Sequence, residues 1–94
     1  MRLNIQHNKE AKQFYALVEG KTCKLDYSTS DNGKVLDFRY TFVPEELRGR
    51  GIAEEIVKHA MDYAKDNHCN VITSCSYVKH FADSHPEYQH VIKK

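Results

Sequence analysis

The hydrophobic period of this 94-residue sequence changes close to Pro44. Before it, TCKLDYS at 22–28 and VLDFRYTFV at 35–43 alternate apolar and polar residues, which is the period of a strand with one buried face. After it, apolar residues recur at spacings of three and four from Ile52 to Tyr63, which is the period of a helix. This change predicts an α+β fold, in which the strands of a sheet come first along the chain and a helix that covers the sheet follows them.

The remaining segments complete the order ββββ-α-β-α. LNIQ at 3–6 and KQFYALVEG at 12–20 are typical of strands, and SDNG at 30–33 predicts a turn because Asn and Gly tolerate positive φ. VITSC at 71–75 predicts a fifth strand, and YVKHFADS at 77–84 predicts a second, shorter helix. We expect a mixed, mostly antiparallel sheet of about five strands, with the fifth parallel to the fourth and the helices packed on the sheet.

Strict alternation assigns the side chains of the third and fourth strands to faces. In the third strand one face is predicted to hold Cys23, Leu25 and Tyr27. In the fourth strand one face is predicted to hold Leu36, Phe38, Tyr40 and Phe42, and the other Asp37, Arg39 and Thr41.

Length and composition predict a single domain over residues 1–94. The chain carries 14 Lys and Arg against 13 Asp and Glu, so it lacks the chain-wide basic field of a nucleic-acid-binding protein. No apolar run approaches the roughly 20 residues that cross a bilayer, and the N-terminus does not resemble a signal peptide, so no membrane partner is expected. Three widely spaced cysteines, Cys23, Cys69 and Cys75, favour a cytoplasmic protein with reduced thiols.

The segment VPEELRGRGIAEEIV at 43–57 gathers two glycines and two arginines where the helix begins. The first turn of a helix has free backbone N–H groups and the positive end of the helix dipole. Glycines let an anion approach the backbone, and arginines add forked donors. The segment therefore predicts a phosphate cradle, with a turn bearing solvated charges as the alternative. The P-loop pattern and the complete G-x-G-x-x-G pattern are both absent.

Within this segment, Arg48-Gly49-Arg50-Gly51-Ile52-Ala53 resembles the Q/R-x-x-G-x-G/A motif of the GNAT superfamily of acetyl-CoA-dependent N-acetyltransferases. Arg48, Gly51 and Ala53 occupy the motif positions. YTFVPEEL ahead of it resembles the fourth GNAT strand, and CSYVKHFADSHPEY at 75–88 resembles a short, single-domain branch that carries a cysteine there. The two motifs extend the resemblance over nearly the whole chain.

The resemblance implies that the anion is the pyrophosphate of acetyl-CoA. It assigns the pyrophosphate to the backbone N–H groups of Arg48, Gly49, Arg50, Gly51, Ile52 and Ala53. It assigns the pantetheine arm to strand-like hydrogen bonds of Thr41, Phe42 and Val43, and places Phe81 near the thiol end. Only HNKEAK links the first two strands, which leaves no room for the helices that full-size GNAT domains carry there. We therefore expect an open acceptor side, which suits a peptide or protein amine.

Cys75 is the first candidate for chemistry, because it stands at the predicted end of the fifth strand and the start of the second helix. A helix N-terminus favours the thiolate, which could attack the thioester and carry the acetyl group. Alternatively, Cys75 assists while the amine attacks directly, or it serves only as a small buried hydrophobe. Tyr77 is the second candidate proton donor, since Phe81 stands where many GNAT enzymes place a tyrosine. No general base is predicted.

Two functions from different classes fit these residues. The first is an N-acetyltransferase acting on an exposed amine, which Cys75 favours. The second is an acyl-CoA-binding module without turnover, which the missing tyrosine and the missing acceptor helices favour. A zinc site is disfavoured, because the gap from Cys69 to Cys75 exceeds the usual two to four residues of a zinc-binding pair, and no metal is expected.

Overall fold

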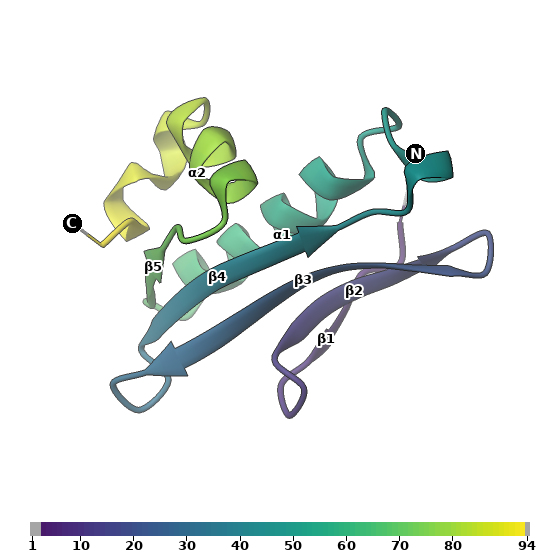
Figure 1. Ribbon diagram of the computed structural model, residues 1–94. Coiled ribbons are helices and arrows are strands. Elements are labelled where there is room, and N and C mark those ends of the chain that lie inside the picture. The colour runs from purple at the N-terminus through teal and green to yellow at the C-terminus, as the bar shows by residue number, and fades with distance from the viewer. Residues whose placement is uncertain (1–2, 94) are drawn as a thin grey trace.

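A computed structural model describes residues 3–93 of the chain. The elements in order are β1 (Gln6–Asn8), β2 (Gln13–Val18), β3 (Lys21–Ser30), β4 (Val35–Phe42), the 3₁₀ turn η1 (Glu45–Leu47), α1 (Ile52–Asp66), β5 (Asn70–Ile72), α2 (Ser76–Asp83) and the 3₁₀ turn η2 (Pro86–Val91). The strands form one sheet in the order β1-β2-β3-β4-β5 (Figure 1). All neighbours are antiparallel except β4 and β5, which run parallel, so the predicted fold class is confirmed.

The first and last strands are displaced from their predicted positions. β1 begins at Gln6, and Leu3 and Ile5, which precede it, pack against the core without joining the ladder. β5 ends at Ile72, so Cys75 is not in the strand but occupies the N-cap position of α2. In both segments the apolar pattern follows the residues that pack against the core. These residues extend beyond the ones that form ladder hydrogen bonds, so the pattern does not give the strand bounds.

A β-bulge interrupts the pairing of β3 with β4. Tyr27 is opposite Phe38, and the preceding residue of β3, Asp26, is opposite Tyr40. Arg39 therefore has no partner across the ladder and is the inserted residue. A bulge of this kind shifts the register of all residues beyond it by one.

The bulge reverses the faces of the last residues of β4. Thr41 lies opposite the fully buried Leu25, on the face that the helices cover. Tyr40 and Phe42 point to the other face, where their rings stack with centroids 6.4 Å apart. The prediction that Tyr40 and Phe42 share a face with Leu36 was therefore wrong, because alternation does not count an inserted residue.

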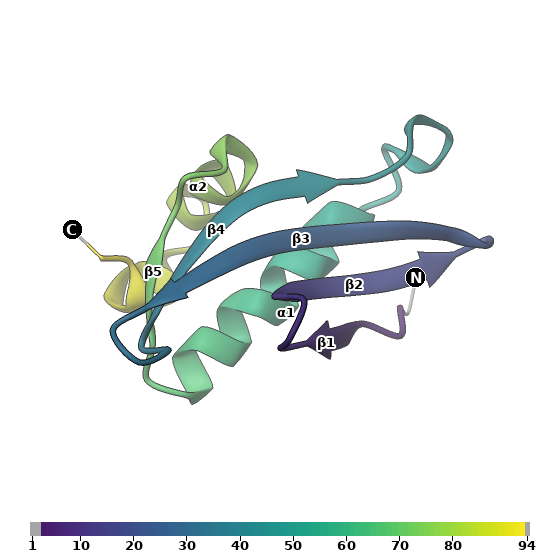
Figure 2. The ribbon, with the colours of Figure 1, turned by 60° about the horizontal axis from the view of Figure 1, so that its bottom comes forward.

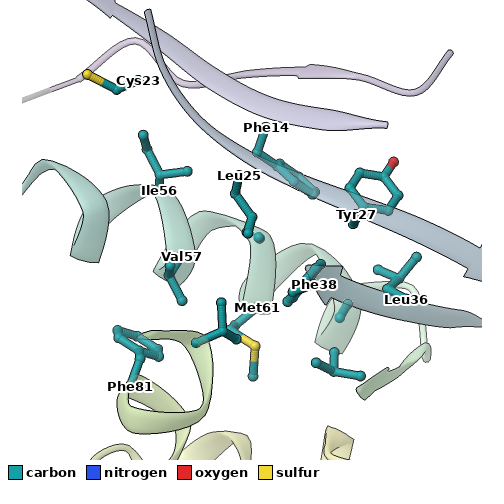
Figure 3. Close-up of a cluster of buried hydrophobic side chains, with 14 of the residues drawn as sticks. Phe14, Cys23, Leu25, Tyr27, Leu36, Phe38, Ile56, Val57, Met61 and Phe81 are labelled. Atoms are coloured by element: carbon teal, nitrogen blue, oxygen red, sulfur yellow. The ribbon is translucent and has the colours of Figure 1, made fainter. Parts of the chain in front are cut away.

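Both helices cover the same face of the sheet, and the strands run in front of them in Figure 2. The inner stripe of α1 is buried and consists of Ile52, Ile56, Val57, Ala60, Met61 and Ala64. Figure 3 shows side chains of β2, β3 and β4 pointing toward this stripe and toward Phe81 of α2. This packing fixes the start of α1 beside the end of β4. None of the helices within residues 3–93 combines the length and apolarity needed to cross a membrane.

No helix within residues 3–93 covers the opposite face of the sheet. Leu17 of β2 is 68% exposed and Tyr40 of β4 is 51% exposed on this face. The loop between β1 and β2 is a tight connection, as predicted from the short segment between these strands.

Candidate functional site

A hollow of about 500 Å³ lies between the end of β4 and the start of α1. Its walls consist of Thr41, Val43, Leu47, Arg48, Gly49, Gly51, Ile52, Ala53, Glu54 and Tyr77. Most of the residues singled out from the sequence as cofactor-binding thus meet in one place. Phe42, Arg50 and Phe81 do not line this hollow, and Leu47 and Glu54 are wall residues that sequence reasoning missed.

Leu47 anchors the loop that forms the rim of the hollow. Its side chain is only 1% exposed, and its backbone N–H donates to the carbonyl of Pro44 at 2.9 Å within η1. The N–H of Arg48 donates to the carbonyl of Glu45 at 3.2 Å in the same turn. A single leucine among charged residues was the signal in the sequence that this loop is held down.

Two glycines give the loop its path. Gly49 has φ +82° and Gly51 has φ +78°, and both values lie in the left-handed region that other residues adopt at a cost. A Cβ atom at either position would meet open space, so the backbone is accessible there. Gly51 is the N-cap of α1, and no side chain caps the helix. The first N–H groups of α1 therefore remain available to an anion.

The two arginines of the loop have different roles. Arg48 lines the hollow, and its Nε donates to the carbonyl of Val43 at 3.0 Å, which braces the loop across its own base. Arg50 turns toward the tip of the β2–β3 hairpin, where its Nη1 lies 2.8 Å from a carboxylate oxygen of Glu19. The side chain of Arg50 therefore ties the loop to the hairpin.

The free edge of β4 lies beside the hollow. The ladder between β4 and β5 covers only Val35–Asp37, and one further bond runs from the N–H of Cys75 to the carbonyl of Phe38 at 2.8 Å. Beyond Phe38 the chain after β5 turns into α2, so β4 has no neighbouring strand on this side (Figure 1). This backbone edge can pair with an extended ligand, as a sheet edge pairs with a peptide.

The thiol of Cys75 lies beside Thr41, with 3.4 Å between Sγ and Oγ1. Burial on its own would raise the pKa of this thiol. The Thr41 hydroxyl and backbone hydrogen bonds from Val78, Tyr77 and Thr41 oppose burial and outweigh it, so the pKa of Cys75 is lowered. A lowered pKa increases the share of thiolate, which is the nucleophilic form.

Tyr77 and Phe81 lie on the same side of α2. Tyr77 is 40% exposed and lines the hollow, and its pKa is raised by burial and by the negative charge of Glu54. Tyr77 therefore keeps its proton at neutral pH. Phe81 is 5% exposed, belongs to the core, and stacks on His85 with ring centroids 3.9 Å apart. Phe81 lines a second hollow that adjoins the first.

The three cysteines are free thiols. Cys23 and Cys69 are buried in the core, and Cys75 is partly exposed. Within residues 3–93, no three His, Cys, Asp or Glu side chains come together in a group that could hold a metal ion.

The arrangement of elements and the sequence both match a known family. A family model described as GCN5-related N-acetyltransferase matches residues 13–91, which extend from the start of β2 to the end of η2. The match therefore includes the hollow, the loop around it and Cys75.

Individual relatives agree with this match. Protein NATD1 of Danio rerio is 33% identical over 90 residues, which cover 93% of this chain and 82% of that protein. Protein NATD1 of Homo sapiens is 26% identical over 90 residues, which cover 95% of this chain and 80% of that protein. The solution structure of a GCN5-like protein from Staphylococcus aureus matches with a TM-score of 0.75 and 26% identity, over 97% of this chain and 88% of that chain.

Proposed function

The chain belongs to the GCN5-related N-acetyltransferase family, and from this premise we propose that it binds acetyl-CoA in the hollow and transfers the acetyl group to an exposed amine. The observation that carries the proposal is the course of the hollow. It runs from Thr41, which contacts Cys75, to the uncapped start of α1 at Gly51. The thioester of an extended acetyl-CoA would thus lie near Thr41 and Cys75 at one end of the hollow, and its pyrophosphate near the start of α1 at the other end.

The residues around the hollow suit the parts of acetyl-CoA. The backbone N–H groups from Arg48 to Ala53 would hold the pyrophosphate, because they lie at the positive end of the α1 dipole. The free backbone edge from Thr41 and Phe42 at the end of β4 to Val43 just beyond it would hydrogen-bond the amides of the pantetheine arm. The side chain of Phe42 points to the other face, so only its backbone would take part. Phe81 would support the site from the core.

The first route to products is direct transfer. Acetyl-CoA supplies an activated acetyl group as a thioester. The nitrogen of the acceptor forms a bond to the carbonyl carbon, the bond from carbon to sulfur breaks, and the amine releases a proton to solvent. Cys75 or Tyr77 would give a proton to the departing sulfur and regain one from solvent. Tyr77 lines the hollow, and Cys75 contacts the wall residue Thr41.

The second route passes through Cys75. Its thiolate forms a bond to the carbonyl carbon and displaces the sulfur of CoA, which leaves as a thiolate and takes up a proton. The acceptor amine then attacks the acetylated Cys75: the bond from carbon to nitrogen forms, the bond from carbon to the sulfur of Cys75 breaks, the amine releases a proton to solvent, and Cys75 regains its thiolate. The lowered pKa of Cys75 supports this route, because the thiolate is more abundant than in an ordinary cysteine.

The acceptor side supports a peptide or protein amine. No helix within residues 3–93 covers the face of the sheet that carries Leu17 and Tyr40. An enclosed pocket for a small amine would need such a cover. An acyl-CoA-binding module without turnover remains the second candidate, favoured by Phe81 at the position where many family members carry a tyrosine.

Turnover with a panel of peptide and small amines, followed by release of CoA thiol, tests the proposal. We expect acetylated product with wild-type protein, and a loss of at least tenfold in Cys75→Ser. A matched control is Cys69→Ser, since Cys69 is a second cysteine remote from Thr41 that contacts the carbonyl of Gly33 instead. Binding of acetyl-CoA without product from any amine would support the binding module, and no binding at all would exclude both functions. Intact-protein mass spectrometry then separates the routes, since only the second acetylates Cys75.

A further inference from the structure

The face of the sheet opposite to α1 and α2, here called the outer face, offers the acceptor a route to the thioester. In the proposed function acetyl-CoA fills the hollow, which lies between the end of β4 and the start of α1. Both helices pack on the inner face and close it (Figure 2). Beyond Phe38 the edge of β4 has no neighbouring strand, so the end of the hollow near Thr41 and Cys75 is approached past this edge.

Two contacts of Cys75 bracket this part of β4. The N–H of Cys75 donates to the carbonyl of Phe38 at 2.8 Å, and its Sγ atom lies 3.4 Å from the Oγ1 atom of Thr41. The chain between these two contacts consists of Arg39 and Tyr40. An acceptor that approaches Cys75 past the free edge of β4 therefore passes these two residues.

The β-bulge brings the side chains of Arg39 and Tyr40 to the outer face together. Asp37 directly precedes the fully buried Phe38, so alternation directs Asp37 outward. The Nη1 atom of Arg39 lies 3.2 Å from the Oδ2 atom of Asp37, which places the side chain of Arg39 on the same face. Tyr40 is 51% exposed there. In a regular strand, successive residues would point to opposite faces, so this pair depends on the bulge.

Arg39 presents a positive charge to solvent at this edge. The side chain of Arg39 is 60% exposed, whereas that of Asp37 is only 20% exposed, so the carboxylate holds the guanidinium from below. A guanidinium has five N–H donors, and the contact with Asp37 occupies few of them. The ion pair between Lys24 and Asp26 on the neighbouring strand differs, because its two side chains are 30% and 34% exposed and neither charge dominates. The group that faces an acceptor is therefore a donor fork, which suits a carboxylate.

Resting on the proposed function, we propose that the acceptor is a peptide amine with an acidic residue beside it, and that Arg39 determines this specificity by binding the acidic side chain. The guanidinium would donate two parallel hydrogen bonds to the carboxylate. The peptide would lie against the ring of Tyr40, and its amine would reach the thioester past the free edge of β4 at Thr41. A peptide with basic residues beside the amine would be repelled by Arg39 and would be a poorer acceptor.

Acetylation of two series of short peptides tests this inference. In the first series the N-terminus is blocked and a single lysine stands between two identical residues; in the second a free N-terminus precedes the same residue, and lysine is absent. The varied residue is glutamate, glutamine or arginine, and kcat/KM is measured by mass spectrometry of the product. In each series that is acetylated, we expect the glutamate peptide to exceed the glutamine peptide at least fivefold and the arginine peptide to be the poorest.

The outcomes separate this inference from the proposed function. Equal kcat/KM for the glutamate and glutamine peptides, or the highest value for the arginine peptide, would overturn the inference and leave acetyl transfer standing. Product from small amines but from none of the peptides would do the same. Absence of product from every peptide and every small amine would overturn the proposed transfer and this inference with it.

Variants of Arg39 assign the preference to this residue. We expect Arg39→Gln to bring the ratio of kcat/KM for the glutamate and glutamine peptides to about one, and Arg39→Glu to favour the arginine peptide over the glutamate peptide. Lys24→Gln is the matched control, since Lys24 is a paired cation of the outer face opposite Phe42, and it should keep the wild-type ratio. Acetyl-CoA should bind all three variants within about threefold of wild type, because neither Arg39 nor Lys24 lines the hollow. A glutamate preference that survives Arg39→Glu, or that falls equally in Lys24→Gln, would overturn the role of Arg39.

Discussion

The Sγ atom of Cys75 lies 3.4 Å from the Oγ1 atom of Thr41, although 34 positions separate these residues in the chain. Two local features produce the contact. The bulge at Arg39 turns Thr41 to the face that the helices cover, and the bond from the N–H of Cys75 to the carbonyl of Phe38 holds the start of α2 against β4. The pair thus lies where β4 loses its neighbouring strand.

Thr41→Val should raise the pKa of Cys75. The substitution keeps the shape of the side chain but removes the hydroxyl, whose hydrogen bond lowers that pKa. The rate of iodoacetamide alkylation at Cys75, measured by peptide mass spectrometry as a function of pH, should shift to higher pH. Thr22→Val is a matched control, because Thr22 is an exposed strand threonine on the far face of the sheet. An alkylation profile that does not move would show that the hydroxyl leaves the thiol unaffected.

Gly51→Ala should lower both stability and the affinity for acetyl-CoA. A left-handed backbone costs an alanine about 1–2 kcal/mol, and the new methyl group would enter the open space at the start of α1, where we propose that the pyrophosphate binds. Gly33→Ala provides the control, since Gly33 has φ +82° and equally open surroundings in the turn between β3 and β4. Urea denaturation should show similar losses for the two variants, and titration should show a loss of at least tenfold only for Gly51→Ala. Equal affinities in the two variants would contradict the position of the cradle.

Exchanging the charges of Arg50 and Glu19 should leave most of the affinity for acetyl-CoA intact. Both side chains are partly exposed, and such pairs contribute about 0.2–1 kcal/mol. We expect Arg50→Glu to weaken binding of acetyl-CoA, because it repels Glu19 and loosens the loop. The double variant Glu19→Arg/Arg50→Glu should recover most of the affinity. If the double variant binds as weakly as Arg50→Glu alone, Arg50 contacts the anion directly and does not act as a tether.

Stability should fall at mildly acidic pH because of His7. Its Nε2 lies 2.6 Å from the hydroxyl of Tyr27, and its ring stacks on Phe14 with centroids 4.0 Å apart. Burial, then the charges of Lys9 and His59, lower its pKa below the ordinary 6.5. His7 therefore takes up a proton less readily in the folded protein than in the unfolded chain. Its contribution to the free energy of unfolding is fully present above about pH 6.5 and is lost as the pH falls toward the lowered pKa of His7.

Urea denaturation at pH 7.5 and pH 5.5 measures this effect. The difference in unfolding free energy between the two pH values should be smaller in His7→Gln than in wild type. His90→Gln, which removes an exposed histidine of η2, should leave the difference unchanged. If His7→Gln loses as much unfolding free energy between the two pH values as wild type does, groups other than His7 cause the acid sensitivity.

The sheet order and the glycine-containing loop at the start of α1 could be predicted from the sequence, because both depend on local patterns. Alternation identified the strands of the meander, and the helical period from Ile52 to Tyr63 identified α1, which spans Ile52–Asp66. Glycine and charge next to a helix start predict the phosphate cradle, which stays a prediction. The direction of β5 followed from the general rule that a strand after a helix crossover runs parallel.

The faces at the end of β4 and the direction of Arg50 could not be predicted in this way. A bulge inserts one residue without a sequence signal at Arg39, and together with the hydrogen bond from Cys75 to Phe38 it brings Thr41 to Cys75. Arg50 finds Glu19 only because the β2–β3 hairpin ends beside the cradle, which is a contact between distant segments. The wall residues Leu47 and Glu54 also acquire their roles from tertiary packing.

The central claim is that acetyl-CoA binds between β4 and α1, and two-dimensional ¹H–¹⁵N NMR during titration tests it most directly. We predict saturable shifts of the backbone amides from Gly49 to Ala53 and of Thr41 to Val43, with those of β1 and the β3–β4 turn unchanged. The same titration of Gly51→Ala should produce these shifts only at much higher ligand concentration. A spectrum without shifts at saturating acetyl-CoA, or shifts confined to residues outside the hollow, would contradict the account.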